Sequence, residues 1–152
     1  MEKFWTQVEH AKLSAADGFS DMLDIAMDVL KRMPQPVSMV SGPMTTGGAS
    51  FEENLKKFGK VIEKLDKEGK TIFNQLPFQN IMLRLYNAWT GPGYCMPLLT
   101  DFYQPIFKSG LVKTVYFIPG WEKSFGASWE HEQAKELGIE RVYLSDEFMA
   151  DL

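Results

Sequence analysis

Residues 112–144 read VKTVYFIPGWEKSFGASWEHEQAKELGIERVYL, and this stretch decides the fold. Val112 to Ile118 is rich in β-branched and aromatic residues and predicts a strand, which a Pro-Gly pair ends. Ser128 to Leu137 is expected to form a helix closed by a glycine, and Arg141 to Leu144 a further strand. A strand, a helix and a second strand in this order form the unit from which parallel sheets are built.

The same order of elements occurs earlier in the chain. Val37 to Ser41 reads as a short buried strand, and residues 42–49 form a glycine-rich loop. Ser50 then opens a helix as its N-cap, with Glu53 completing a capping box. Thr71-Ile72-Phe73 is expected to be another strand. The whole pattern predicts an α/β protein with an open, mainly parallel sheet of four to five strands and helices on both faces.

A helical extension, residues 1–36, is expected ahead of an α/β domain at residues 37–152. Apolar residues recur at helical spacing between residues 5 and 33, which predicts one long helix or two shorter ones broken near Gly18. This apolar face is expected to pack on the body of the domain or on a second subunit, because its acidic first turn argues against a membrane surface. The middle of the chain predicts two further helices, at residues 78–89 and 98–108.

Composition and charge exclude several classes of protein. The chain has 152 residues, of which 45% are apolar and 24% charged, and this profile is typical of a globular domain. Sixteen basic and 20 acidic residues give a net charge of −4, which argues against a duplex nucleic-acid-binding protein. No apolar run is long enough for a membrane span. With Cys95 as the single cysteine and two histidines, we expect a cytoplasmic protein without disulfide, metal or cofactor.

Two loops follow predicted strands at the position where ligands bind in open α/β sheets. These loops, Ser41 to Ser50 and Pro119 to Glu130, contain glycine and lead into a helix N-terminus, which suits a phosphate or carboxylate. The first is neither a P-loop nor a dinucleotide fingerprint, so alone it is equally consistent with a tight loop that binds nothing. Glu130 is expected in the first helical turn, where the dipole favours its charged form whether or not it has a further role.

Both loops carry longer motifs. The first is Val40-Ser41-Gly42-Pro43-Met44-Thr45, followed by a helix and the extended segment Ile72-Phe73-Asn74. The second is residues 115–134, with Ile-Pro-Gly-Trp-Glu-Lys-Ser-Phe-Gly-Ala ahead of a Gly-x-x-x-Glu that ends at Glu130. Together they resemble the nucleoside 2-deoxyribosyltransferase-like superfamily, in particular a branch of small bacterial and phage proteins that begin Gly-Pro-Met-Thr. The resemblance covers roughly residues 37–145 and implies a Rossmann- or flavodoxin-like sheet.

The resemblance also implies roles for individual residues. Glu130 matches the superfamily's nucleophile, which attacks the anomeric carbon of a deoxynucleoside and forms a glycosyl-enzyme ester that water or a second base resolves. A second carboxylate from the helix before the strand helps protonate the leaving base, and here Asp101 takes that role. No metal or cofactor is implied, whereas a homo-oligomer is. The implied substrate-binding residues are Ser41, Gly42, Pro43, Met44, Ser124 and Gly126.

Ser124 bears on the substrate, because it stands six residues before Glu130. In the superfamily, transferases of free nucleosides tend to have aspartate there, and hydrolases of deoxynucleoside 5′-monophosphates tend to have serine. Against a nucleotide substrate, the first loop lacks the arginine of those hydrolases. Three alternatives stay open: an N-glycosidic-bond enzyme acting through Glu130, a nucleotide-binding protein without turnover, and an interaction module that uses its N-terminal helices. A buried Glu130 in a cleft beside Asp101 would favour the enzyme.

Overall fold

The computed structural model describes residues 3–44 and 50–152, so residues 45–49 of the expected glycine-rich loop lie outside the described residues. The strands are β1 (Val37–Ser41), β2 (Val112–Phe117) and β3 (Glu140–Tyr143). The α-helices are α1 (Gln7–Ser14), α2 (Phe19–Arg32), α3 (Phe51–Lys67), α4 (Gln79–Asn87), α5 (Gln104–Lys108), α6 (Phe125–Leu137) and α7 (Asp146–Ala150). Shorter turns are the 3₁₀ elements η1 (Leu76–Phe78) and η3 (Trp121–Lys123) and the π-helix η2 (Leu98–Tyr103).

The sheet is parallel throughout, in the order β1-β2-β3. The expected parallel α/β class is therefore confirmed, but the described part of the chain has three strands instead of four to five. The segment predicted as a strand at residues 71–73 lies beside β1 and forms only a single parallel bridge, between Ser38 and Ile72. It leaves the sheet early because the Asn74 side chain accepts a hydrogen bond from the Leu76 backbone N–H, 3.0 Å away, which starts η1.

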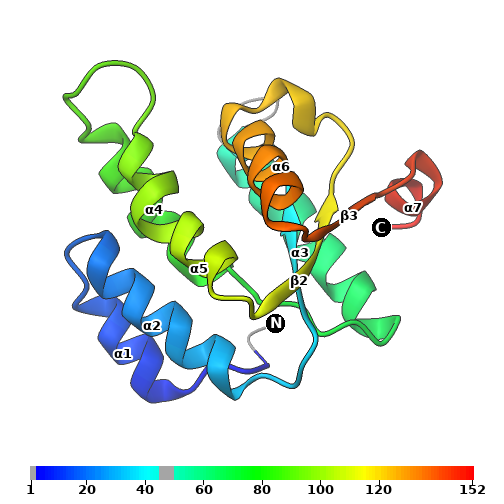
Figure 1. The fold of residues 1–152 in the computed structure, drawn as a ribbon, viewed down its shortest axis with the longest axis horizontal. Coiled ribbons are helices and arrows are strands. Elements are labelled where there is room, and N and C mark those ends of the chain that lie inside the picture. Colours follow the sequence, from blue (N-terminus) through cyan, green and yellow to red (C-terminus); the bar gives the residue numbers. More distant parts are fainter. Residues whose placement is uncertain (1–2, 45–49) are drawn as a thin grey trace.

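Helices cover both faces of the sheet, as expected for strands whose side chains alternate. On one face, Val40, Tyr116 and Ile118 contact the apolar side of α3 and residues of α7. On the other face, Met39 and Phe117 belong to a larger core that includes side chains of α2, η2, α5 and α6. Figure 1 shows this arrangement, with α6 and α3 on opposite sides of the strands.

The two N-terminal helices belong to the same core as the rest of the chain. The break expected near Gly18 is found, since Gly18 is the N-cap of α2. Apolar residues of this region, among them Leu13 and Met22, pack into one cluster with Phe73 and Phe102. Figure 1 shows α1 and α2 side by side along one edge of the molecule. This region thus contributes to the main hydrophobic core.

The helix that carries Glu130 starts earlier than expected. The predicted start was Ser128, whereas α6 begins at Phe125. Ser124 is its N-cap, and the Ser124 hydroxyl accepts a hydrogen bond from the Ala127 N–H at 3.2 Å. Glu130 therefore lies in the second turn of the helix, and its expected place in the first turn is wrong. Among the residues that the structure describes, none of the helices combines the length and apolar character needed to cross a bilayer.

Candidate functional site

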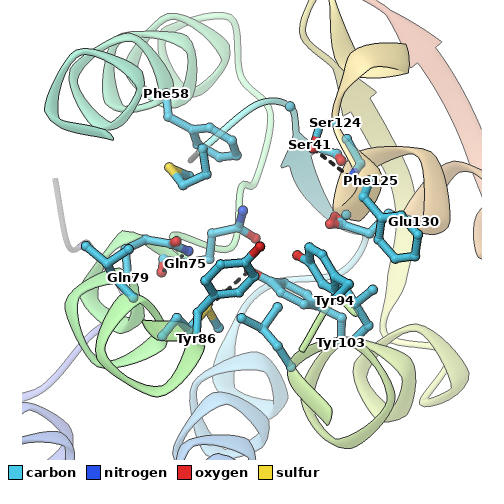
Figure 2. Close-up of a pocket in the computed structure, with 18 of the residues that line it drawn as sticks. Ser41, Phe58, Gln75, Gln79, Tyr86, Tyr94, Tyr103, Ser124, Phe125 and Glu130 are labelled. Atoms are coloured by element: carbon cyan, nitrogen blue, oxygen red, sulfur yellow. Dashed lines mark hydrogen bonds between the residues drawn. The ribbon is translucent and has the colours of Figure 1, made fainter. Parts of the chain in front are cut away.

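A cavity of about 270 Å³ lies at the carboxyl end of β1, next to the N-terminus of α6. This is the edge of the sheet where open α/β proteins bind ligands. The cavity is bounded by Ser41 and Gly42 on one side, by α6 on a second, and by residues of α3, α4 and η2 on the others. Figure 2 shows Ser41, Ser124 and Glu130 together at one side, facing a set of tyrosine and glutamine side chains.

Most of the residues expected to bind substrate contribute to this cavity. Its lining includes Ser41, Gly42, Met44, Ser124, Gly126 and Glu130, which come from two segments at least 80 positions apart in the sequence. Pro43 lies between two of these residues but is not itself part of the lining. The two motifs found in the sequence therefore meet at one place in space.

Asp101, the expected second carboxylate, does not reach the cavity. It lies on η2, is exposed, and its Oδ1 atom accepts a hydrogen bond from the Thr100 hydroxyl at 3.2 Å. The same helix presents Leu98, Leu99 and Tyr103 to the cavity instead. The structure thus does not bring Asp101 and Glu130 together, because the apolar face of this helix, and not its acidic residue, is turned inward.

Glu130 is a buried carboxyl group with little polar support. Its side chain is 7% exposed, and its Oε1 atom has no hydrogen-bond partner among the described residues. Burial raises the pKa of Glu130 from 4.5 to about 8, and the nearby Ser41 hydroxyl offsets this rise only in part. The expectation that the helix dipole keeps Glu130 charged is therefore wrong, because the dipole acts mainly within the first turn and Glu130 lies beyond it.

The N-terminus of α6 offers a polar end to the cavity. Ser124 is buried and caps the helix, and Phe125 and Gly126 follow with backbone N–H groups that an α-helix leaves without an intrahelical acceptor. Lys123 is the one basic residue in the described lining, and it is exposed. An anionic group on a ligand would be accommodated here better than near Glu130, since N–H groups and a cation both favour negative charge.

Close contacts explain why glycine occupies two positions of the motifs. A Cβ atom on Gly42 would lie 2.8 Å from Cβ of Ile118, so glycine lets the chain after β1 approach the chain after β2. A Cβ atom on Gly126 would lie 3.0 Å from the Tyr94 hydroxyl. Glycine at these positions keeps the two loops close and leaves room for Tyr94 inside the cavity.

Aromatic and amide side chains in the lining were missed by sequence reasoning. Tyr94 stacks on Phe125 with ring centroids 4.5 Å apart and contacts Tyr86 edge to face. Burial, together with the neighbouring Glu130, raises the pKa of Tyr94 and of Tyr103, so both hydroxyls stay protonated. Figure 2 shows all three tyrosines on the side opposite Ser41 and Ser124. Tyr86 lies on α4 and Tyr103 on η2, whereas Tyr94 lies in the segment that joins these two elements.

Gln75 and Gln79 could have been found. Residues 71–73 were expected to be a strand, and the position just after a parallel strand is where functional side chains gather. Both side chains are buried and line the cavity, although they were not among the expected site residues.

His131 belongs to a separate aromatic cluster. Its ring stacks on Trp121 with centroids 4.2 Å apart, and its Nε2 atom lies 2.6 Å from the Tyr143 hydroxyl. Burial, with a smaller effect of the nearby Arg141 charge, lowers the pKa of His131. It is absent from the cavity lining.

Within residues 3–44 and 50–152, His, Cys, Asp and Glu side chains form no group of three or more that could hold a metal ion. Comparisons with models of protein families, with curated proteins and with solved structures gave no match. The chemistry of the site is therefore argued from its own geometry.

Proposed function

We propose that the protein cleaves or transfers at the N-glycosidic bond of a deoxynucleoside or its 5′-monophosphate, with Glu130 as the nucleophile. The observation that carries the proposal is the position of Glu130. It is buried in a cavity at the carboxyl end of β1, beside the Ser41, Ser124 and Gly126 that the two motifs had paired with it. A carboxylate held against a sugar in a water-poor cavity is the arrangement that covalent glycosyl transfer needs.

In the proposed reaction, ionised Glu130 attacks the anomeric carbon. A bond forms between its carboxylate oxygen and that carbon, and the bond to the base nitrogen breaks with its electron pair leaving on the base. The base takes up a proton and departs. Water, losing a proton, or the nitrogen of a second base then displaces the ester and frees Glu130. A deoxy sugar suits this route because the absent 2′-hydroxyl no longer withdraws electrons from the developing positive charge.

The proton for the leaving base has two sources under this proposal. Asp101 is not one of them, since it lies outside the cavity. Solvent entering at the cavity mouth can supply it, as can the Tyr94 hydroxyl, which lines the cavity. Because the pKa of Tyr94 is raised, its hydroxyl holds the proton strongly and acts only once the departing base has become strongly basic.

A second candidate is a nucleotide-binding protein without turnover. Two features of the site favour it: the high pKa of Glu130, which leaves roughly one-tenth of the carboxyl ionised at pH 7, and a described lining without a second carboxylate. Binding alone would need the same tyrosines, glutamines and helix N-terminus. It would not need Glu130 to be charged.

We further propose that the protein assembles with copies of itself near the cavity. Phe125 at its edge is 54% exposed and Trp89, next to α4, is 37% exposed. Large apolar side chains at a surface are commonly covered in oligomers. Light scattering on the purified protein would test this, and a monomer mass would contradict it.

The decisive experiment is to incubate the protein with a panel of deoxynucleosides, their 5′-monophosphates and the matching ribonucleosides, and to assay free base by chromatography. Release of base from a deoxy substrate, with a sugar-bound intermediate detected on the protein by mass spectrometry, supports the enzyme. Saturable binding of the same compounds without base release supports the binding protein. If the protein neither binds these compounds nor releases base from them, the enzyme proposal and the binding-protein proposal are both overturned.

A further inference from the structure

Three buried side-chain oxygens have no hydrogen-bond partner among the described residues, and all three belong to the lining of one cavity. They are Ser41 Oγ, Gln75 Oε1 and Glu130 Oε1. Unpaired polar atoms are rare in protein interiors, because water is removed from them without replacement. Ser41 Oγ lies close enough to Glu130 to lower the pKa of that carboxyl, so these two groups are neighbours. Gln75 Oε1 is left without a partner among the described residues, and a polar ligand would supply the missing hydrogen bond.

Gln75 presents its acceptor oxygen to that space. Its Nε2 atom donates a hydrogen bond to the Val40 backbone carbonyl at 3.3 Å. Turning the amide over would place Oε1 against that carbonyl oxygen, and two acceptors would then face each other. The side chain is 3% exposed, so water does not relieve such a contact. The backbone is held too, since the Gln75 carbonyl accepts from the Phe78 N–H at 3.1 Å.

The surroundings of Gln75 suit a flat ring. Phe58, Met82, Leu83 and Tyr86 also line the cavity. Figure 2 shows the Gln75 side chain between those of Phe58 and Tyr86, while Glu130 lies across the cavity beside Phe125. A ligand with an aromatic ring at the Gln75 side and a polar group at the Glu130 side fits this division.

We propose that Gln75 selects nucleosides whose base carries an exocyclic amino group over those with an oxo group at the same place. This inference rests on the proposed function and deepens it by naming the class of base. The amino group of adenine or cytosine donates to Gln75 Oε1. Hypoxanthine and uracil place an acceptor oxygen there, which faces the fixed Gln75 oxygen in a buried space. The unmatched pair weakens binding by roughly tenfold to a hundredfold.

Matched ligand pairs test this directly. Isothermal titration gives dissociation constants of deoxyadenosine against deoxyinosine, and of deoxycytidine against deoxyuridine, for the wild-type protein. We expect each amino compound to bind more tightly by the factor given above. Equal affinities within both pairs overturn the selection by Gln75 and leave the proposed function standing. If neither the four nucleosides nor their 5′-monophosphates bind, the proposed function falls and this inference with it.

Two variants locate the effect. Gln75→Met keeps the side-chain length and removes the acceptor, so the ratio within each pair is expected to fall towards one. Gln75→Glu can donate from its protonated oxygen to the Val40 carbonyl and keep its other oxygen as the acceptor, so this variant is expected to retain the preference. Gln133→Met, on α6 and outside the lining, is the control and is expected to keep the wild-type ratios. An unchanged ratio in Gln75→Met overturns the proposal. Because the ratio compares two ligands on one protein, moderate loss of stability does not obscure it.

Discussion

Glu9 and Glu130 both have little exposed surface, but their pKa values shift in opposite directions. Glu9, 5% exposed, completes the capping box of α1 and pairs with Arg32, whose Nη2 atom lies 2.7 Å from Glu9 Oε1. These contacts lower its pKa to about 2. Glu130, 7% exposed, has no ion-pair partner among the described residues, and burial raises its pKa to about 8. Loss of contact with water therefore dominates the pKa of Glu130, whereas the hydrogen bond with Arg32 dominates that of Glu9.

The contrast separates a structural carboxylate from a candidate functional one. The protein satisfies Glu9 from within its own chain, so a ligand would add nothing there. It leaves Glu130 unsatisfied in a cavity, which costs folding free energy and has no structural benefit. Perturbed titratable groups in cavities are for this reason frequent at functional sites. Each prediction that follows tests whether this distinction holds.

The largest effect is expected on the reaction itself. Glu130→Ala removes the nucleophile and should lower base release by roughly a thousandfold or more, as loss of covalent nucleophiles does in other enzymes. Glu136→Gln, an exposed change on the same helix, is the control and should keep the wild-type rate. Free base is measured by chromatography, with circular dichroism as a check of folding. A Glu130→Ala protein with wild-type rates would remove the proposed mechanism.

The two glutamates should change stability in opposite directions when made neutral. Between pH 4.5 and about 8 the folded protein holds a proton on Glu130 that the unfolded chain releases, so wild-type stability falls as pH rises through this window. Glu130→Gln avoids this loss and should be more stable than wild type by about 1–4 kcal/mol at pH 8. Below pH 4.5 the difference should vanish. Urea denaturation at several pH values measures it.

Glu9→Gln, in contrast, should lower the stability of the protein. The folded pKa of about 2 lies below the unfolded value of 4.5, so the charge on Glu9 stabilises the fold above pH 4.5 and this contribution is lost as pH falls towards 2. At pH 7 the variant should lose about 1–3 kcal/mol, less than a fully buried pair, because the Arg32 side chain is 44% exposed. Stabilisation by Glu9→Gln, or destabilisation by Glu130→Gln at pH 8, would break the comparison.

The pH dependence of the reaction should follow the Glu130 carboxyl. If its ionised form attacks the sugar, kcat/KM should rise about tenfold per pH unit below the pKa of about 8 and level off above it. The rate is measured with one deoxynucleoside across buffers of constant ionic strength. A rate that falls above pH 8 would instead identify the neutral carboxyl as the reactive form and reject a nucleophilic role.

The sequence predicted those parts of the site that depend on strand ends and helix caps. Short apolar runs separated by helices led to the parallel sheet, and its geometry brings Ser41 and Glu130 together. Asp101 was expected in the cavity because it is an acid on the preceding helix, but which face of a helix turns inward depends on packing against the rest of the core. The pKa of Glu130 could not be predicted from the sequence either, because it depends on burial and on nearby groups that only the folded structure defines.

Strand counting failed for a local reason. Residues 71–73 have the composition of a strand, yet Asn74 captures the Leu76 N–H and turns the chain after a single bridge. Such side-chain competition with the sheet ladder is common for asparagine. The helix start at Phe125 was misjudged similarly, because Ser124 and Ser128 are both possible caps and only the structure shows that Ser124 accepts from Ala127.

The smallest and most selective effect is expected for Ser124. This residue has a structural role as a helix cap, like Glu9, and lines the cavity, like Glu130. Its oxygen already accepts from Ala127 N–H, but its hydroxyl proton is free to be donated to a ligand. Ser124→Ala should cost about 0.5–2 kcal/mol of stability, the usual value of a lost N-cap. Ser145→Ala removes an equivalent cap, on α7, that accepts from Phe148 N–H at 3.0 Å, and it is the matched control.

If Ser124 also binds phosphate, only Ser124→Ala should weaken the binding of a deoxynucleoside 5′-monophosphate, by roughly tenfold more than that of the free nucleoside. Equal weakening of both ligands would restrict Ser124 to its capping role, since a lost cap that merely loosens α6 affects the whole cavity and not the phosphate end alone.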